Sequence, residues 1–219
     1  MTTHPADDAV ERAVREQRLV AVLRLRDHGR AVAVAETLVE AGVKVLEFTL
    51  DHPDALGAIR AVAGRLPEGA FIGAGTVLDT TQVAAARAAG ATFCVSPHAD
   101  PEVIAACRGA GLAPLPGIAT ATELVTARRA GATLLKLFPA GPLGVGYLKA
   151  LRGPFADAEL VPTGGVELDD IATWLRAGAT AVGVGSSLVD RQGTLDGLAE
   201  RARRAVAAVR DAAERGADS

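Results

Sequence analysis

The chain has 219 residues, which suits a single domain with a large core. Hydrophobic residues make up 49% of it and aromatic residues only 3%, so Ala, Val and Leu must build that core. A net charge of −3 gives no reason to expect a nucleic-acid partner, and no apolar run approaches the roughly 18 residues of a membrane span. The polar N-terminal segment contains no apolar stretch of the secretory type, so we expect a cytoplasmic location.

One local design recurs along the chain: an Ala-rich amphipathic stretch ends at a glycine, and a short apolar run follows. Examples are VEAGVKVLEF (39–48), RAAGATFCVS (87–96) and RRAGATLLKLF (128–138). Glycine directly after a helix is the expected left-handed cap, and a short run rich in Val and Leu after such a turn is typical of a strand buried on both faces. The pattern predicts eight strands, which start near Leu19, Lys44, Ala70, Thr92, Ala113, Thr133, Glu159 and Thr180.

Helical patterns lie between these strands, for example at 30–40, 53–66, 80–89 and 167–177. A leading helix is expected before residue 19 and a closing helix at about 194–215. Alternation of strand and helix implies parallel pairing with right-handed crossovers. Eight such units predict a (β/α)8 TIM barrel, formed as one domain by residues 1–219. An open, doubly wound sheet is the alternative architecture.

Lys136 lies within the apolar run ATLLKLFPA (132–140), where a cation is least stable. The chain has three lysines against 20 arginines, so a lysine at this place is informative. Loss of solvation favours the neutral amine, which can add to a ketone and form a Schiff base, whereas a guanidinium cannot. The alternative interpretation is a lysine at a strand end whose ammonium group reaches water.

Residues two apart on a strand share a face, and the inward side chains of a barrel stack in layers drawn from alternate strands. Lys136 on the sixth expected strand and Glu47 on the second can therefore meet across the interior. A carboxylate beside a lysine supplies the proton shuttle that imine chemistry needs, although a structural ion pair would have the same pattern. Arg24, at the end of the first strand, is either a clamp for a substrate carboxylate or an ordinary surface arginine.

Two glycine-rich turns follow the last two expected strands, in VPTGGVELDD (161–170) and VGVGSSLVD (182–190). In a TIM barrel these two loops frequently bind phosphate. The backbone N–H groups and hydroxyls that suit a phosphate dianion belong to Gly164, Gly165, Gly185, Ser186 and Ser187. Tight turns also need glycine for structural reasons, so each turn alone is a weak signal.

Two more strand ends carry polar side chains. Thr76, in the turn GAGTVLD (73–79), can hydrogen-bond a ligand carboxylate or keto oxygen. His98, which follows Ser-Pro, is a candidate proton shuttle, although a capping or exposed histidine is more common. The histidines and cysteines of the chain show no metal-ligand spacing, so we predict neither a metal nor another cofactor.

With these motifs the chain resembles the class I 2-dehydro-3-deoxy-6-phosphogluconate (KDPG) aldolases, a family that also handles 4-hydroxy-2-oxoglutarate (KHG). The resemblance runs from about residue 20 to residue 188, and LKLFPA (135–140) followed by PTGG (162–165) is its most specific part. The other motifs, in the same order, are VAVLR (20–24), LEFTL (46–50), IGAGTVL (72–78), SPH (96–98), LPGIATATEL (115–124), YLKALRGPF (147–155) and VGVGSSL (182–188).

The resemblance implies a Schiff base on Lys136 and a general acid/base role for Glu47. The pyruvate pocket is implied to comprise Thr76, Pro97 and Phe138, and the phosphate site Gly164, Gly165, Gly185 and Ser186. A (β/α)8 barrel and a homotrimer are also typical of the family. The implied substrate is a phosphorylated 2-keto acid, KDPG, which is cleaved to pyruvate and glyceraldehyde 3-phosphate; no nucleic acid or membrane takes part.

One position departs from the pattern of some family members, in which an arginine after the LEFTL-like motif binds the substrate carboxylate. Asp51 occupies that position here. Other members of the family also lack the arginine. We expect Asp51 to cap the helix that starts near Pro53, which leaves Arg24 as the carboxylate ligand. The departure leaves the exact substrate open, with the same chemistry on the 6-phosphogalactonate analogue or on KHG as the alternative. A non-covalent sugar-phosphate isomerase or binding protein is a further alternative.

Overall fold

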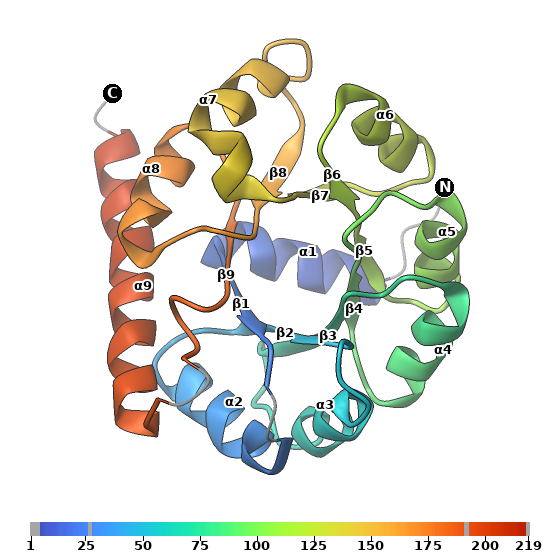
Figure 1. Ribbon diagram of the computed structural model, residues 1–219, viewed down its shortest axis with the longest axis vertical. Coiled ribbons are helices and arrows are strands. Elements are labelled where there is room, and N and C mark those ends of the chain that lie inside the picture. The colour runs from blue at the N-terminus through green and yellow to red at the C-terminus, as the bar shows by residue number, and fades with distance from the viewer. Residues whose placement is uncertain (1–4, 26–27, 191–192, 218–219) are drawn as a thin grey trace.

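The computed structural model describes residues 5–25, 28–190 and 193–217. Its strands ring a common centre; the first helix lies across one end of this ring, and the other helices pack around the outside (Figure 1). The strands are β1 (Leu19–Leu23), β2 (Val45–Thr49), β3 (Phe71–Gly75), β4 (Phe93–Val95), β5 (Ala113–Leu115), β6 (Gly117–Ile118), β7 (Leu134–Leu137), β8 (Glu159–Pro162) and β9 (Val182–Val184). The helices are α1 (Pro5–Gln17), α2 (Ala31–Glu40), α3 (Ala55–Ala63), α4 (Thr80–Ala88), α5 (Pro101–Gly109), α6 (Ala121–Arg129), α7 (Ala140–Arg152), α8 (Ile171–Arg176) and α9 (Leu195–Ala217), with 3-10 turns η1 (His28–Arg30) and η2 (Leu168–Asp170).

Within the described residues, the strands pair in two parallel sheets with the orders β5-β4-β3-β2-β1-β9 and β6-β7-β8. The single strand predicted from Ala113 onward is divided at Pro116, because proline has no N–H to donate to a neighbouring strand. The carbonyl of Pro116 still accepts a hydrogen bond from the backbone N–H of Lys136 at 2.9 Å. Beyond β8, Thr163 forms a parallel bridge with Gly183 of β9. The parallel α/β fold that the alternating pattern predicted is confirmed.

The predicted helices are present, but several are shorter than their patterns. The pattern at 53–66 forms a helix only over Ala55–Ala63, and the one at 167–177 becomes η2 followed by α8. The glycine of the recurring motif has the predicted left-handed conformation, for example φ +98° at Gly42 and +101° at Gly178. Among the described helices, none combines the length and the apolar character needed to cross a bilayer.

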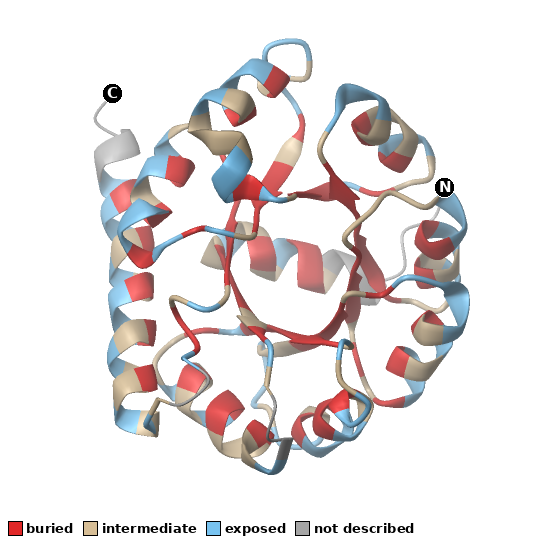
Figure 2. Ribbon diagram, viewed as in Figure 1, coloured by how far each residue is buried: buried red, intermediate tan, exposed pale blue. Residues whose placement is uncertain are grey.

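Two apolar cores stabilise the fold. The larger one lies between the strands and the outer helices, where Figure 2 shows buried positions on the helix sides that face the strands. The smaller one includes Val20, Val45, Phe93 and Leu134 from the strands, together with two valines from α1. These valines, Val10 and Val14, are both 0% exposed, and burial of each contributes about 1.5–3 kcal/mol. Helix α1 therefore covers the amino-terminal ends of the strands.

Candidate active site

A cavity of about 340 Å³ lies at the carboxyl-terminal ends of the strands. The ten site residues predicted from the sequence all contribute to its wall: Arg24, Glu47, Thr76, Pro97, Lys136, Phe138, Gly164, Gly165, Gly185 and Ser186. They come from loops and strands spread over most of the chain, so it is the parallel arrangement that brings them together. Active sites of parallel α/β folds lie at this end of the strands.

Lys136 and Glu47 face one another inside the cavity. Nζ of Lys136 lies 3.8 Å from Oε1 of Glu47, and the two side chains are 8% and 2% exposed. Nζ also lies 5.1 Å from the centre of the Phe138 ring, a distance at which the ring attracts a cation. Val45 and Leu134, two residues before Glu47 and Lys136 on the same strand faces, pack in the inner core. Lys136 and Glu47 therefore meet across the interior, as the two-residue spacing on their strands predicted.

The Glu47 carboxyl is held in an environment that favours its protonated form. Burial raises the pKa of Glu47 above its ordinary value, and the positive charges of Lys136 and Arg24 oppose only part of that effect. Its Oε1 is buried and has no hydrogen-bond partner among the described residues. A side chain on Gly75 would overlap this carboxyl, so glycine is required at the end of β3 to make room for it. The carboxyl is thus poised to exchange a proton with a ligand.

Arg24 follows β1 and contributes to the rim of the cavity, with its side chain 56% exposed. Its Nε lies 2.8 Å from Oδ2 of Asp51, and Oδ1 of Asp51 accepts a hydrogen bond from Oγ1 of Thr49 at 2.6 Å. The prediction that Asp51 caps the helix near Pro53 is wrong, because the carboxylate is engaged by Arg24 and Thr49 and α3 begins later, at Ala55. The ion pair involves Nε, one of five guanidinium N–H donors, and so restrains Arg24 at the rim.

The glycine turn after β8 forms one end of the cavity wall. Gly164 and Gly165 have φ of +84° and +79°, a backbone conformation that other residues rarely adopt. A Cβ on Gly164 would come within 2.8 Å of the Phe138 ring. Gly185 and Ser186 line the same cavity, but Ser187 does not, since its hydroxyl donates to the carbonyl of Val166 at 3.1 Å. The interpretation of Ser187 as a phosphate ligand is therefore wrong.

The remaining candidates lie at the ends of β3 and β4. Thr76 lines the cavity with φ of +59°, unusual for a residue other than glycine and common at functional sites. Pro97 also lines the cavity, whereas His98 does not; its Nε2 lies 3.9 Å from Oδ2 of Asp100 and its side chain is 42% exposed. Across the described part of the chain, no group of three or more His, Cys, Asp or Glu side chains is placed to hold a metal ion.

Some wall residues were not singled out from the sequence: Val22, Thr49, Thr163, Val166, Glu167 and Val189. Val22 and Thr49 share strand faces with predicted residues, so the two-residue alternation alone signals them. Glu167 carries no such signal, because an acidic residue directly before a helix is also typical of a helix start.

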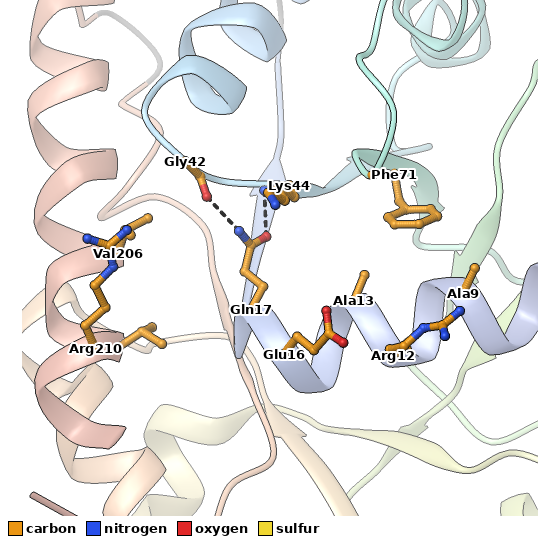
Figure 3. Close-up of a pocket in the computed structure, with 12 residues that line it drawn as sticks. Ala9, Arg12, Ala13, Glu16, Gln17, Gly42, Lys44, Phe71, Val206 and Arg210 are labelled. Atoms are coloured by element: carbon orange, nitrogen blue, oxygen red, sulfur yellow. Dashed lines mark hydrogen bonds between the residues drawn. The ribbon is translucent and has the colours of Figure 1, made fainter. Parts of the chain in front are cut away.

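A second cavity, of about 450 Å³, lies at the amino-terminal end between α1, α9 and the starts of β2 and β3 (Figure 3). Its lysine, Lys44, is exposed. Beside it, Gln17 donates to the carbonyl of Gly42 at 2.7 Å and accepts from the backbone N–H groups of Lys44 and Val45 at 2.6 and 3.0 Å. No ion pair joins Lys44 to a carboxylate among the described residues, so the larger cavity lacks a nucleophile paired with a base.

The family model for KDPG and KHG aldolase matches residues 10–200. The 2-dehydro-3-deoxy-6-phosphogalactonate aldolase of Escherichia coli is 36% identical over 197 residues, which cover 90% of this chain and 96% of the relative. The structure of the 2-keto-3-deoxy-6-phosphogluconate aldolase of Zymomonas mobilis is similar with a TM-score of 0.84 and 30% identity, over 90% of this chain and 96% of that one. The KDPG aldolase of Legionella pneumophila, solved with pyruvate captured as a covalent carbinolamine, has a TM-score of 0.82 and 29% identity, over 87% and 95% of the two chains.

These comparisons and the lysine–carboxylate cavity define the class of protein: it is an aldolase, a carbon–carbon lyase. The chain belongs to the KDPG and KHG aldolase family. The resemblance read from its motifs is thereby confirmed.

Proposed function

We propose that this enzyme catalyses the reversible aldol cleavage of KDPG to pyruvate and glyceraldehyde 3-phosphate through a Schiff base on Lys136. The observation that carries the proposal is the position of Nζ of Lys136, buried 3.8 Å from Oε1 of Glu47 in the cavity that the glycine turns also line. Groups held this close act on one substrate with a high effective concentration. The carbinolamine captured in the Legionella relative supports the same chemistry.

The first half of the reaction forms the imine and breaks the carbon chain. The amine of Lys136 adds to the C2 ketone, and loss of water gives a protonated imine. Ionised Glu47 then removes the proton from the C4 hydroxyl. The C3–C4 bond breaks because the iminium accepts its electron pair, which leaves an enamine of pyruvate and releases the aldehyde.

The second half restores the enzyme. Protonated Glu47 returns its proton to C3 of the enamine, and water hydrolyses the resulting imine to free pyruvate and the Lys136 amine. Glu47 must therefore accept a proton and later donate one. Its raised pKa supports this double role, since an acid/base group works best when its pKa lies near the working pH.

We further propose how the cavity orients the substrate. Arg24, restrained by Asp51, binds the carboxylate of the 2-keto acid by charge-assisted hydrogen bonds. Thr76, Pro97 and Phe138 surround the pyruvate portion. At the other end, backbone N–H groups of the two glycine turns bind the phosphate, at the loops that commonly do so in this architecture: Gly164, Gly165, Gly185 and Ser186.

The architecture that supports this site is, in our proposal, a closed (β/α)8 barrel formed as one domain, rather than an open sheet. The continuous chain through Pro116 links β5 to β6, and the Thr163–Gly183 bridge links the end of β8 to β9. A homotrimer and a cytoplasmic location are further proposals, which rest on the family resemblance. Sedimentation equilibrium tests the trimer directly.

Two substrates compete with KDPG within the same chemistry. The E. coli relative is named for the 6-phosphogalactonate analogue, which differs from KDPG at C4, and the family model also covers KHG. Release of pyruvate from each of the three compounds, measured as kcat/KM, tests the assignment. We expect the highest value with KDPG, and a higher value with either rival would reassign the substrate while keeping the mechanism.

A non-covalent isomerase or a sugar-phosphate binding protein is the alternative outside this chemistry. Either one would use Lys136 and Glu47 only as a structural ion pair. It predicts no cleavage of any 2-keto acid and full function in Lys136→Arg, whereas the aldolase predicts loss of cleavage in that variant.

A further inference from the structure

Glu167 belongs to the wall of the cavity at the end that we assign to the substrate phosphate. It lies two residues after Gly165 and lines the wall together with Gly185 and Ser186. The residue is exposed, and no ion pair joins it to a cation among the described residues. The turn that should bind an anion therefore carries a negative charge of its own.

The positive side chains that line this cavity, within the described part of the chain, are Arg24 and Lys136. Each already has a carboxylate beside it: Asp51 lies 2.8 Å from Arg24, and Glu47 lies 3.8 Å from Lys136. At the glycine end, the groups available to an anion are backbone N–H dipoles and the hydroxyl of Ser186. These donors carry only partial positive charges, whereas Glu167 carries a full negative charge.

The two possible ends of a sugar-acid substrate respond to Glu167 in opposite ways. A phosphate dianion is repelled by a nearby carboxylate, and the repulsion is moderate because an exposed group is screened by water and salt. An uncharged terminal hydroxyl, by contrast, can donate a hydrogen bond to the carboxylate, and such charge-assisted bonds are among the stronger ones. Glu167 thus favours the unphosphorylated form of the same carbon skeleton.

We propose that Glu167 sets the preference of this aldolase between phosphorylated and unphosphorylated 2-keto-3-deoxy sugar acids. Its carboxylate weakens phosphate binding at the glycine turns and accepts a hydrogen bond from the terminal hydroxyl of the unphosphorylated acid. The inference rests on the proposed function, because both substrates must form the Lys136 imine.

The test compares kcat/KM for KDPG and for its unphosphorylated counterpart in the wild type and in Glu167→Gln, which keeps the size of the side chain. We expect the variant to gain about three- to tenfold on KDPG and to lose activity on the unphosphorylated acid, whose terminal hydroxyl then meets a neutral amide. The gain should shrink as the ionic strength rises, because salt screens an exposed charge. Glu200→Gln, which removes an exposed charge from α9 outside the cavity, is the matched control and should leave the ratio of the two values unchanged.

A ratio that stays at its wild-type value in Glu167→Gln, or falls, overturns the inference. Failure of the proposed function gives a different result: the wild type cleaves neither acid and forms no borohydride-stable adduct with pyruvate. Titration calorimetry with inorganic phosphate decides the role of Glu167 even then. It should show tighter phosphate binding by Glu167→Gln than by the wild type, and equal or weaker binding contradicts the proposed repulsion.

Discussion

Two cavities lie at opposite ends of the strands, and each has one lysine in its wall. At the carboxyl-terminal end, Lys136 is 8% exposed and lies 3.8 Å from a buried carboxyl oxygen. At the amino-terminal end, Lys44 is exposed in a wall that also carries Arg12 and Arg210 (Figure 3). The amino-terminal cavity is the larger, at about 450 Å³ against about 340 Å³. Size therefore does not identify the reactive site in this protein.

The two ends of the strands differ in how deeply their lysine is buried. Helix α1 covers the amino-terminal ends of the strands with Val10 and Val14, so Lys44 remains at the surface. At the carboxyl-terminal end, loops surround the cavity, and Lys136 and Glu47 lie below its rim. The desolvation that raises the pKa of Glu47 makes the pair reactive and also disfavours its charge in the folded state.

Replacing lysine by arginine at each end in turn should separate the two cavities most strongly. Lys136→Arg keeps the positive charge but removes the amine that forms the imine, so kcat/KM should fall by at least about 10⁴-fold. Lys44→Arg makes the same exchange in the other cavity and should leave kcat/KM unchanged. Steady-state assays of pyruvate release on both variants check the contrast, and equal losses would remove the distinction between the two ends.

Glu47→Gln tests two effects of the buried carboxyl: its role as a proton shuttle, and the loss of folding stability that its ionisation causes. Without a proton shuttle, kcat should fall by about 10²- to 10⁴-fold. In the wild type, the folded state holds the Glu47 proton to higher pH than the unfolded state does, so stability falls as the pH rises from the ordinary carboxyl range through the raised pKa. The variant has no such group to titrate, so its stability relative to the wild type should increase across that range.

Urea unfolding of both proteins at pH 4, 6 and 8 measures this difference. The quantity to follow is the unfolding free energy of Glu47→Gln minus that of the wild type. If this difference stays constant or falls as the pH rises, the assigned burial of the carboxyl is contradicted.

A smaller effect is expected from a methyl group added beside the carboxyl. The Cβ of Gly75→Ala would overlap Glu47 and displace it, so kcat should fall by about 10- to 10²-fold, as misplacement of a catalytic group by about 1 Å can do. Gly57→Ala, in α3, is the matched control because no atom lies within 4 Å of the added Cβ. That control should keep full activity, and an unchanged kcat in Gly75→Ala would mean that Glu47 tolerates movement.

The smallest expected effect concerns the rim. Arg24→Gln removes the proposed carboxylate clamp while Lys136 and Glu47 stay in place, so KM should rise by about tenfold with a small change in kcat. Initial rates at varied KDPG concentration separate the two constants. An unchanged KM would leave Arg24 as the surface arginine that its exposure also permits.

The main features of this site were predictable because they depend on short-range periodicity. The two-residue alternation around Glu47 and Lys136, combined with their places on alternate strands, was enough to predict that they meet. Glycines after helices located the strand starts to within one or two residues, except where Pro116 divides a strand.

The features that were missed depend on contacts between distant segments. The ion pair of Arg24 with Asp51 requires the ends of β1 and β2 to lie side by side, and local sequence favoured a helix cap for Asp51 instead. Ser187 and Ser186 are chemically identical neighbours in the sequence, and only the fold turns one toward the carbonyl of Val166. Glu167 has the local pattern of a helix start, and its place in the cavity wall appears only when β8 and β9 are adjacent.

In the proposed mechanism, the amine of Lys136 bonds to the carbonyl carbon of a 2-keto acid. Incubation with pyruvate and borohydride, followed by peptide mass spectrometry, tests it most directly. We expect a single reduced pyruvate adduct on the peptide that contains Lys136, and none on peptides that contain Lys44 or Lys149. An unmodified Lys136 peptide, or an adduct on Lys44 instead, would contradict it.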